Sequence, residues 1–298
     1  MSRPVLSMPA SQSMGAISLY AQASPGFAQK LEASRALLKS AAAQFTPLTQ
    51  ASSLGAEDMV LTHLIAETGI ASGVFVLDTR MLHVQTLALV GQLEARYGLP
   101  IDVYQPEPQA AAAFVRTNGE NAMYRSLQLR QDCCHIRKVE PLERALAGKK
   151  GWITGLRREQ STARADVPDV EHQELLIQGK AISRAKINPL ADWTWGDVWH
   201  FIATHKVPYN PLPDAFFPSI GCAPCTRAVT LGEDFRSGRW WWEQQSAREC
   251  GLHVAADGKH EAQEPAAFEP SSSALRGSAS SPASSPVSRI IPIQETPA

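Results

Sequence analysis

Apolar residues in the middle of the chain form two alternating kinds of run. Short segments typical of strands occupy residues 47–52, 74–77, 101–104 and 152–154, and 74–77 is a continuous run of β-branched, aromatic and aliphatic residues. Apolar side chains recur at helical spacing between them and over residues 108–147, for example at Leu61, Leu64 and Ile65. The helix expected after residue 79 carries Leu82, Leu89, Val90 and Leu93. This alternation predicts an α/β fold with a mostly parallel central sheet flanked by helices.

Polar and glycine-containing segments follow three of these strands. In such sheets ligands bind beyond the carboxyl ends of the strands. The segment 53–58 also begins a helix, where backbone N–H groups and the helix dipole favour anions, although it is not a Walker A motif. The candidate ligand-binding residues at the strand ends are Ser53, Gly55, Glu57, Asp58, Asp78, Thr79 and Gly155.

One further helix has a clear start. Thr194 and Asp197 have the spacing of a capping box. Trp195, Val198, Trp199 and Ile202 follow at helical spacing. We therefore expect a helix from about residue 195, with its tryptophans packed in the core.

The two ends of the chain differ from this pattern. Residues 1–25 show no sustained periodicity and lack the continuous apolar region of a signal peptide, so we expect a flexible arm and a cytoplasmic protein. Residues 261–298 contain nine serines and six prolines, a composition that predicts a disordered tail. The length between them suits one α/β domain.

Composition and charge narrow the classes of partner. The 298 residues include 28 basic and 29 acidic ones, for a net charge of −1. Nucleic-acid binding depends on excess Lys and Arg, so a nucleic-acid partner is not expected. No stretch of about 18 apolar residues exists, so we expect no membrane span. Nothing in the residues decides between a monomer and a homo-oligomer.

Four of the five cysteines form two local pairs. Cys133 and Cys134 are adjacent, and Cys222 and Cys225 form a C-x-x-C motif. Thiolates in this number suit an iron–sulfur cluster or a tetrahedral zinc ion. Adjacent cysteines on one helix diverge by about 100°, which favours a cluster wider than a single ion. Zinc, and inert or disulfide-bonded cysteines, stay open as alternatives.

The fifth cysteine stands apart, just before the serine-rich tail. Cys250 has His253 nearby and several arginines upstream. Such surroundings can hold a thiol as the nucleophilic thiolate. The alternative is a surface cysteine without a role.

Basic residues lie close to these motifs in the sequence. They are Lys138, one helical turn after Cys134, then Arg157, Arg158 and Arg164 after the fourth strand, and Arg236 and Arg239 before three tryptophans. In a near-neutral protein they suggest a small phosphate- or sulfate-containing anion, because arginine matches such oxygens with paired donors. Each could instead be a solvated surface charge.

Together these segments resemble the adenylyl-sulfate reductases, the iron–sulfur branch of the phosphoadenylyl-sulfate reductase family. The resemblance runs from about residue 30 to 254. Its most specific parts are CCHIRKVEPL at 133–142, SIGCAPCTR at 219–227 and ECGLH at 249–253. Further matching segments are 53–58, 77–79, 155–161, 188–193, 232–234 and 236–242.

The resemblance implies a fold, a reaction and roles for residues. The fold is adenine-nucleotide α-hydrolase-like, related to PP-loop ATP pyrophosphatases but with a degenerate loop. The reaction is thioredoxin-dependent reduction of adenosine 5′-phosphosulfate to sulfite and AMP, in sulfate assimilation for cysteine biosynthesis. Cys250 would be the nucleophile, with His253 supporting its thiolate. The other four cysteines would hold a 4Fe-4S cluster, and Lys138, Arg236 and Arg239, with Arg164 a further candidate, would hold the phosphosulfate.

Two departures and the domain boundaries complete this expectation. Arg80 stands where relatives usually have glycine. In relatives the nucleophile usually lies close to the C-terminus, whereas in this chain a long serine-rich tail follows His253. We expect a nucleotide-binding, iron–sulfur reductase domain over residues 26–243, a mobile segment with Cys250 over 244–260, and the disordered tail beyond it.

Three alternatives stay open. The substrate could be the 3′-phosphorylated nucleotide, alone or alongside the unphosphorylated one, although relatives that use only that substrate typically lack the four cysteines. A PP-loop ATP-dependent enzyme that thiolates tRNA is disfavoured, because the 53–58 loop lacks the Ser-Gly-Gly-x-Asp-Ser pattern and the charge is near neutral. A zinc-stapled binding module is the non-enzymatic alternative.

Overall fold

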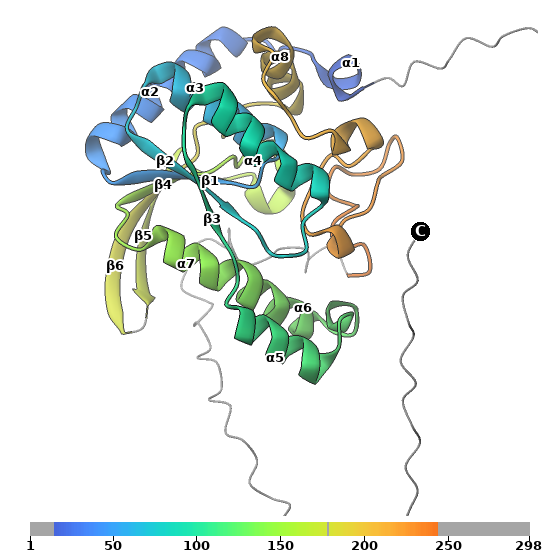
Figure 1. Cartoon of the computed structure of the whole chain (residues 1–298). Coiled ribbons are helices and arrows are strands. Elements are labelled where there is room, and N and C mark those ends of the chain that lie inside the picture. Colours follow the sequence, from blue (N-terminus) through green and yellow to red (C-terminus); the bar gives the residue numbers. More distant parts are fainter. Residues whose placement is uncertain (1–14, 178, 244–298) are drawn as a thin grey trace, which may run out of the picture. The chain divides into compact units, whose positions relative to one another are not determined.

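The computed structural model describes residues 15–177 and 179–243. Its centre is a six-stranded sheet with strand order β3-β2-β1-β4-β6-β5, in which every neighbouring pair is parallel except β5 and β6 (Figure 1). The strands are β1 (Leu48–Ser52), β2 (Ser72–Leu77), β3 (Ile101–Tyr104), β4 (Gly151–Ile153), β5 (Val170–Ile177) and β6 (Lys180–Ile187). The predicted α/β class and mostly parallel sheet are confirmed.

Helices cover both faces of the sheet (Figure 1). The longer ones are α2 (Phe27–Gln44), α3 (Ala56–Thr68), α4 (Val84–Tyr97), α5 (Pro108–Asn118), α6 (Leu127–Cys134), α7 (Glu140–Leu146) and α8 (Trp195–His205). Successive side chains of β2 point to opposite faces of the sheet. Val74 and Val76 pack in the larger core with α2, α3, α4 and α8, whereas Phe75 packs against Leu142 of α7.

The capping box of α8 forms as expected. The hydroxyl of Thr194 accepts a hydrogen bond from the Asp197 backbone N–H at 3.0 Å, and the Asp197 carboxylate accepts one from the Thr194 N–H at 2.9 Å. Trp199 is fully buried and Trp195 is half-buried against the same core. The prediction of core tryptophans is therefore confirmed for Trp199 and holds in part for Trp195.

The N-terminal arm expected over residues 1–25 is too long. A short helix, α1 (Ala16–Tyr20), lies against α8, and the Ala16 N–H donates to Asp214 Oδ1, in the 3-10 turn Leu212–Ala215, at 2.7 Å. The ring of Tyr20 contacts those of Trp195 and Trp199. These contacts make the chain from residue 15 onwards part of the folded domain, and residues 1–14 lie outside the described residues.

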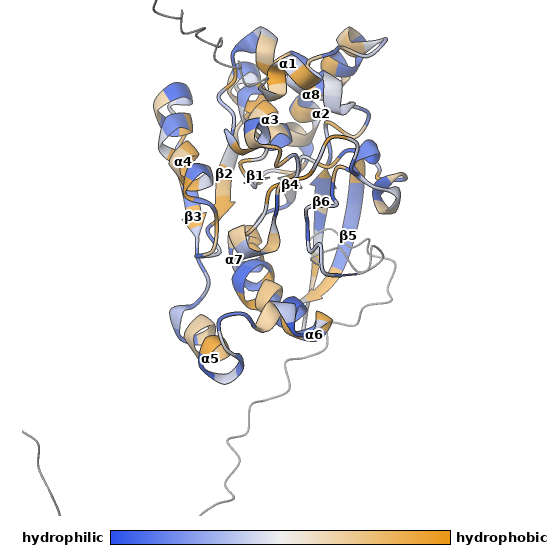
Figure 2. Cartoon of the chain, turned by 90° about the vertical axis from the view of Figure 1, so that its right-hand side faces the viewer, coloured by the Kyte–Doolittle hydropathy of each residue, from blue (hydrophilic) through white to orange (hydrophobic). Residues whose placement is uncertain are grey.

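The hairpin of β5 and β6 was not predicted. Its strands place buried charges rather than an apolar run at the edge of the sheet: Lys186 pairs with Glu171 at 3.1 Å, and Arg184 pairs with Glu143 at 2.8 Å. Figure 2 accordingly shows most of β5 and β6 as hydrophilic and β2 as hydrophobic. Buried ion pairs alternate here with the buried apolar side chains Ala185 and Ile187, so these strands contain no continuous apolar run like that of β2.

Two helical expectations also change. The helix after β2 begins at Val84, so Leu82 precedes it and pairs as an isolated β-bridge with Cys222. The segment 108–147 is interrupted by a 3-10 turn (Ala122–Tyr124) and by a π turn (His135–Val139). The turn that separates Cys134 from Lys138 is thus wider than the α-helical turn expected.

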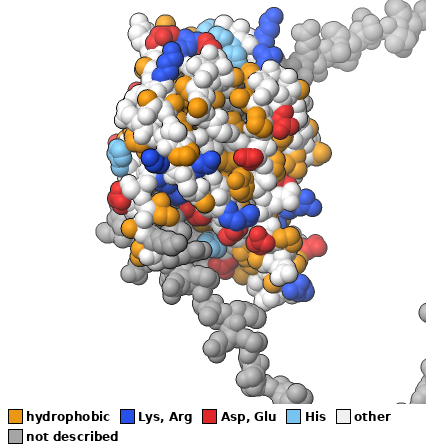
Figure 3. All heavy atoms as spheres, turned by 60° about the vertical axis from the view of Figure 1, so that its left-hand side comes forward, with side chains coloured by type: hydrophobic (Ala, Val, Ile, Leu, Met, Phe, Trp, Pro, Cys, Tyr) orange, Lys and Arg blue, Asp and Glu red, His pale blue; other side chains and the backbone are white. Residues whose placement is uncertain are grey.

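The surface agrees with the near-zero net charge. On the face shown in Figure 3, basic and acidic side chains are interspersed. No helix in the described part of the chain is both long and apolar enough to cross a bilayer.

A histidine pair on α3 and α8 predicts loss of stability in acid. His63 lies 5.4 Å from the His205 ring, and its Nδ1 lies 3.0 Å from the hydroxyl of Tyr97. Burial, and next the charge of His205, lower the pKa of His63. Because the folded state favours the neutral ring, the stability it adds is complete above pH 6.5, the ordinary value, and is lost as the pH falls below it.

We expect the urea midpoint to fall between pH 7.5 and 5.5 by more in the parent than in a His63→Gln variant. Measuring both chains at both pH values cancels acid effects from the rest of the molecule. Equal falls in the two chains would show that His63 does not contribute to the acid sensitivity.

Candidate active site

The main cavity lies beyond the carboxyl ends of β1, β2 and β4. Ser53 and Gly155, from the loops after β1 and β4, both line it. The chain runs from β1 toward β3 on one side and places β4 on the other, so this is the switch point at which doubly wound sheets bind ligands. Predicted residues that line the cavity are Ser53, Gly55, Glu57, Asp58, Thr79, Lys138, Gly155, Arg164, Arg236 and Arg239.

Asp58 joins two of the loops that form the cavity. Its Oδ2 accepts hydrogen bonds from the backbone N–H and the hydroxyl of Ser53, at 2.7 and 2.6 Å. Burial raises the pKa of Asp58 to about 6, although hydrogen bonds from Ser53 and the Gly155 N–H oppose the shift. A Cβ on Gly155 would lie 2.5 Å from Asp58 Oδ1, so only glycine allows this approach.

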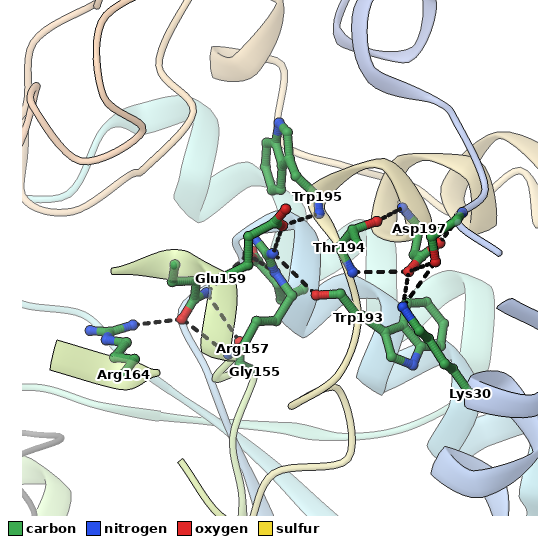
Figure 4. Close-up of polar contacts among 12 residues, drawn as sticks. Lys30, Gly155, Arg157, Glu159, Arg164, Trp193, Thr194, Trp195 and Asp197 are labelled. Atoms are coloured by element: carbon green, nitrogen blue, oxygen red, sulfur yellow. Dashed lines mark hydrogen bonds and ion pairs between the residues drawn. The ribbon is translucent and has the colours of Figure 1, made fainter. Parts of the chain in front are cut away.

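Arg157 lies behind the cavity wall rather than in it. Its guanidinium is almost fully buried and donates to Glu57 Oε1 at 3.0 Å, to Glu159 at 2.7 Å and to the Trp193 carbonyl at 3.3 Å. Figure 4 shows Arg157 between Glu159 and Trp193, with Trp195 above it. The residue predicted to bind substrate instead fixes the position of Glu57, which does line the cavity.

Two other predicted residues do not line the cavity. Arg158 forms ion pairs with Asp169 and Asp192 near the surface. Asp78 accepts hydrogen bonds from the Arg80 N–H and from the Gln105 amide, both at 2.9 Å. Arg158 is paired with carboxylates 11 and 34 residues later in the sequence. Asp78 shapes the loop that presents Thr79.

Gln160 is a cavity residue that was not predicted. Its amide N–H groups donate to Glu57 at 3.0 Å and to the Gly155 carbonyl at 3.2 Å, while its oxygen accepts from Arg164 at 2.7 Å. Gln160 therefore fixes the positions of two side chains that line the cavity, the acidic Glu57 and the basic Arg164. Its place within the segment 155–161, next to predicted arginines, was the available signal.

Four basic side chains face the same cavity: Lys138, Arg164, Arg236 and Arg239. Arg239 donates to the Ile220 carbonyl at 2.9 Å and stacks 4.6 Å above the ring of Trp240. Its Nε is buried without a hydrogen-bond partner among the residues that the structure describes. An anionic ligand would meet both cationic charge and an unused donor here.

Glycine 221 makes room for this guanidinium. A Cβ at Gly221 would lie 2.4 Å from the Nη2 of Arg239 and 2.6 Å from its Cζ. Because the obstructed atoms are the end of a long side chain, we expect a Gly221→Ala variant to fold normally but to displace Arg239. The KM for the anionic substrate should rise by about tenfold, the loss of one charged hydrogen bond.

The matched comparison is an Arg239→Ala variant together with the double variant. Since both substitutions remove the same contact, their effects on KM should not add. Full additivity, measured by steady-state kinetics, would show that Gly221 acts on something other than Arg239.

A smaller cavity beside the first is lined by four cysteines. Cys133 and Cys134 come from the end of α6, and Cys222 and Cys225 come from a turn around residues 223–225. All four are buried, and none forms a disulfide with another described cysteine. The predicted convergence of the two cysteine pairs is therefore present in the fold.

The cysteine cavity is connected to the main cavity. Lys138 lines both cavities. The hydroxyl of Thr79 lies 3.2 Å from the Cys222 sulfur, and the Thr79 carbonyl accepts from Arg137 at 3.0 Å. Anything bound by the four sulfurs would thus be one side chain away from a ligand in the main cavity.

The chemistry of this donor set suits a cationic metal group. Burial raises the pKa of Cys133 to about 11 and that of Cys225 to about 12, and neighbouring cysteines add to both shifts. Thiols with such values stay protonated at neutral pH unless a metal replaces their protons. Within the described residues, no three His, Cys, Asp or Glu side chains form a site for a single metal ion.

Basic residues surround the four sulfurs. Arg130, Arg137 and Lys138 line the cysteine cavity. A cluster with four thiolate ligands carries net negative charge, which such cations would stabilise. Arg130 was missed, although its position three and four residues before the cysteines on one helix was a usable signal.

The predicted nucleophile lies outside the described residues. Neither Cys250 nor His253 is described, and the description ends at Glu243. Seven residues of chain span at most about 24 Å. That length bounds how far Cys250 can lie from Glu243.

Comparisons with known proteins agree on one family. The family described as "Phosphoadenosine phosphosulfate reductase domain" matches residues 47–228. An adenosine 5′-phosphosulfate reductase of Burkholderia cepacia is 48% identical over 77% of this chain and 90% of its own length. A protein of the same name from Allochromatium vinosum is 50% identical over 73% of this chain and 82% of its own.

A solved structure supports the same grouping. The phosphoadenylyl-sulfate reductase of Candida auris, in a phosphate complex, is 28% identical with a TM-score of 0.54. The match covers 66% of this chain and 90% of that one. With the family match over more than half of the chain, these likenesses show that the chain belongs to the phosphoadenosine phosphosulfate reductase family.

Proposed function

We propose that this chain reduces adenosine 5′-phosphosulfate to sulfite and AMP, with thioredoxin as the electron donor. One observation carries the proposal: a cavity lined by four basic side chains shares Lys138 with a cavity lined by four cysteines. Relatives named for this substrate are 48 and 50% identical, whereas the structure named for the 3′-phosphorylated substrate is 28% identical.

The cavity lining divides into two parts that suit the two parts of the substrate. Apolar side chains from β2 and the loop after it, such as Val76, Leu77 and Leu82, would pack against adenosine. Lys138, Arg236 and Arg239 would hold the phosphosulfate, with Arg164 as a further cation. These cations would reduce the repulsion between an attacking thiolate and the anionic sulfate and would stabilise the leaving phosphate.

The proposed reaction starts with a covalent step at Cys250. The thiolate attacks the sulfate sulfur, so that a sulfur–sulfur bond forms as the bond between sulfur and the bridging phosphate oxygen breaks. AMP leaves with that oxygen, and the enzyme carries an S-sulfocysteine. His253, three residues later, is the candidate to support the thiolate.

Thioredoxin then completes the reduction. One of its thiolates attacks the Cys250 sulfur and expels sulfite, which leaves with the bonding electron pair. The second thioredoxin thiol resolves the mixed disulfide and restores the Cys250 thiolate. The two electrons that reduce the sulfate sulfur thus come from the thioredoxin dithiol, which ends as a disulfide.

We also propose that Cys133, Cys134, Cys222 and Cys225 hold a 4Fe-4S cluster. When bound, this group would supply a fixed charge distribution beside the substrate site. Thr79 would contact one ligand sulfur, and Lys138 would lie between the ligands and the substrate. We propose the cytoplasm as the location, because thiolate ligands of a cluster must stay reduced and thiols persist in a reducing compartment.

Trapping the intermediate tests the proposed function. We expect full-length protein incubated with adenosine 5′-phosphosulfate, without thioredoxin, to gain the mass of SO3 on Cys250 and to release one AMP per chain. Adding reduced thioredoxin should then release sulfite. Enzyme that produces sulfite in the full assay but never carries the adduct would contradict the covalent route.

A further inference from the structure

A buried ion pair fixes the last described residue of the chain. Arg130, on α6, donates from Nε to Glu243 Oε1 and from Nη2 to Glu243 Oε2, both at 2.9 Å. The exposed fractions of the two side chains are 1% and 7%. Two parallel hydrogen bonds of this kind set both the position and the direction of Glu243.

Trp240, three residues earlier, is held just as closely. Two guanidiniums stack on its ring, that of Arg130 with its Cζ 4.9 Å from the ring centroid and that of Arg239 with its Cζ at 4.6 Å. The backbone N–H of Trp240 donates to the Cys225 carbonyl at 3.2 Å, and the Trp240 carbonyl accepts from the Glu243 backbone N–H at 2.9 Å. The backbone of Trp240 has φ +42°, a conformation that needs such fixation in a residue other than glycine.

Arg130 therefore connects three parts of the molecule. It lines the cysteine cavity, it stacks on Trp240, which lines the main cavity, and it binds Glu243, where the segment toward Cys250 begins. A buried ion pair is by itself weak evidence of a stabilising role, because desolvation offsets most of its attraction. Its value here lies in the geometry that it imposes.

We propose that Arg130 and Glu243 are a positioning pair that fixes the start of the segment bearing Cys250 against the wall formed by Arg239 and Trp240. This inference rests on the proposed function, because it needs Cys250 as the nucleophile. Attack on sulfur requires alignment as well as proximity, so a shift in the start of a seven-residue tether would slow the covalent step. Nucleotide binding would be spared, because neither Arg130 nor Glu243 lines the main cavity.

A Glu243→Gln variant of the full-length, cluster-loaded protein tests the proposal. It keeps the size of the side chain and removes its charge, so the ion pair between Arg130 and Glu243 is lost. We expect adduct formation on Cys250 in a single turnover to slow by at least about tenfold. The dissociation constant for AMP and the iron content per chain should stay within about twofold of the parent.

The matched control is Glu143→Gln, on α7. Glu143 forms the same paired hydrogen bonds with Arg184, at 2.8 and 2.9 Å, and Arg184 is likewise buried. This variant also removes a carboxylate charge from a buried arginine, although the Glu143 side chain is 30% exposed, and the pair lies between α7 and β6. We expect its rate of adduct formation to stay within about twofold of the parent.

The outcomes separate this proposal from the proposed function. Parent enzyme that forms no adduct on Cys250 overturns the proposed function. If the parent forms the Cys250 adduct and the Glu243→Gln variant forms it at the same rate, only the proposal of a positioning pair is overturned. If the rate, AMP affinity and iron content of Glu243→Gln all fall together, or if Glu143→Gln slows as much, the role is structural and the proposal is likewise wrong.

Discussion

A Cys250→Ser variant should form no measurable sulfite, a loss of at least about a thousandfold. Serine keeps the size of the side chain but replaces sulfur by an alcohol, which is a weaker nucleophile at neutral pH. Even if its oxygen accepted the sulfate group, the product would be a sulfate ester. Thioredoxin reduces bonds between two sulfur atoms, so that ester would not release sulfite. Sulfite production with reduced thioredoxin is the measurement.

The same variant should keep every property that depends on the described fold. Among the residues that the structure describes, those lining both cavities lie between Ala51 and Trp240, so AMP binding and iron content should match the parent. Retained binding would show that the lost activity reflects lost chemistry. A Cys250→Ser enzyme that produces sulfite at the parental rate would remove Cys250 from the mechanism, whatever the other four cysteines hold.

A central strand of the parallel sheet could be predicted because it is buried on both faces: Val74, Phe75 and Val76 of β2 are buried in succession. The apolar run at 74–77 corresponds to strand Ser72–Leu77, and the strand expected at 101–104 corresponds to Ile101–Tyr104. Where burial is achieved with charges, the same reasoning failed. Lys186 is almost fully buried at the edge hairpin, and its partner Glu171 lies 15 residues away. Periodicity of apolar residues carries no information about such pairs.

The site was predictable where chemistry is local in the sequence. Adjacent cysteines and a C-x-x-C motif indicated four convergent sulfurs, and the fold brings them to one cavity. The arginines were less predictable, because a basic residue near a strand end can turn to either side of the loop. Arg157 forms an ion pair with Glu57, a hundred residues away, and Arg158 forms ion pairs with Asp169 and Asp192. Only the folded chain shows which acids are within reach.

Arg80 shows why a departure from the usual glycine matters. Its backbone has φ +59°, which glycine adopts readily and other residues adopt at a cost of about 1 kcal/mol. The hydrogen bond from its N–H to Asp78 Oδ1 holds the turn in this conformation. Most of its side chain is exposed. The substitution therefore preserves the loop that presents Thr79 and adds a guanidinium on its outer side.

The second large effect is expected at the cysteine cavity. The parent, purified without oxygen, should contain about four irons and four sulfides per chain and should be brown. A Cys225→Ser variant should lose most of both, because a buried hydroxyl is a poor ligand for iron. Sulfite formation should fall by at least about a hundredfold. One reason is that the Cys225 carbonyl, which accepts from the Trp240 N–H, belongs to the turn that the cluster would hold in place.

Thr79→Val provides the matched control for this loss. It removes the hydroxyl that lies 3.2 Å from the Cys222 sulfur but leaves all four thiols, so iron and sulfide should stay near the parental amounts. Quantitation of iron, zinc and sulfide in the three proteins distinguishes the alternatives at once. Colourless parent protein with one zinc per chain would show that the four cysteines form a structural zinc site and hold no iron–sulfur cluster. A cluster held by four thiolates should lose iron when one thiolate is removed. A Cys225→Ser variant that keeps four irons would therefore show that Cys225 is not a ligand.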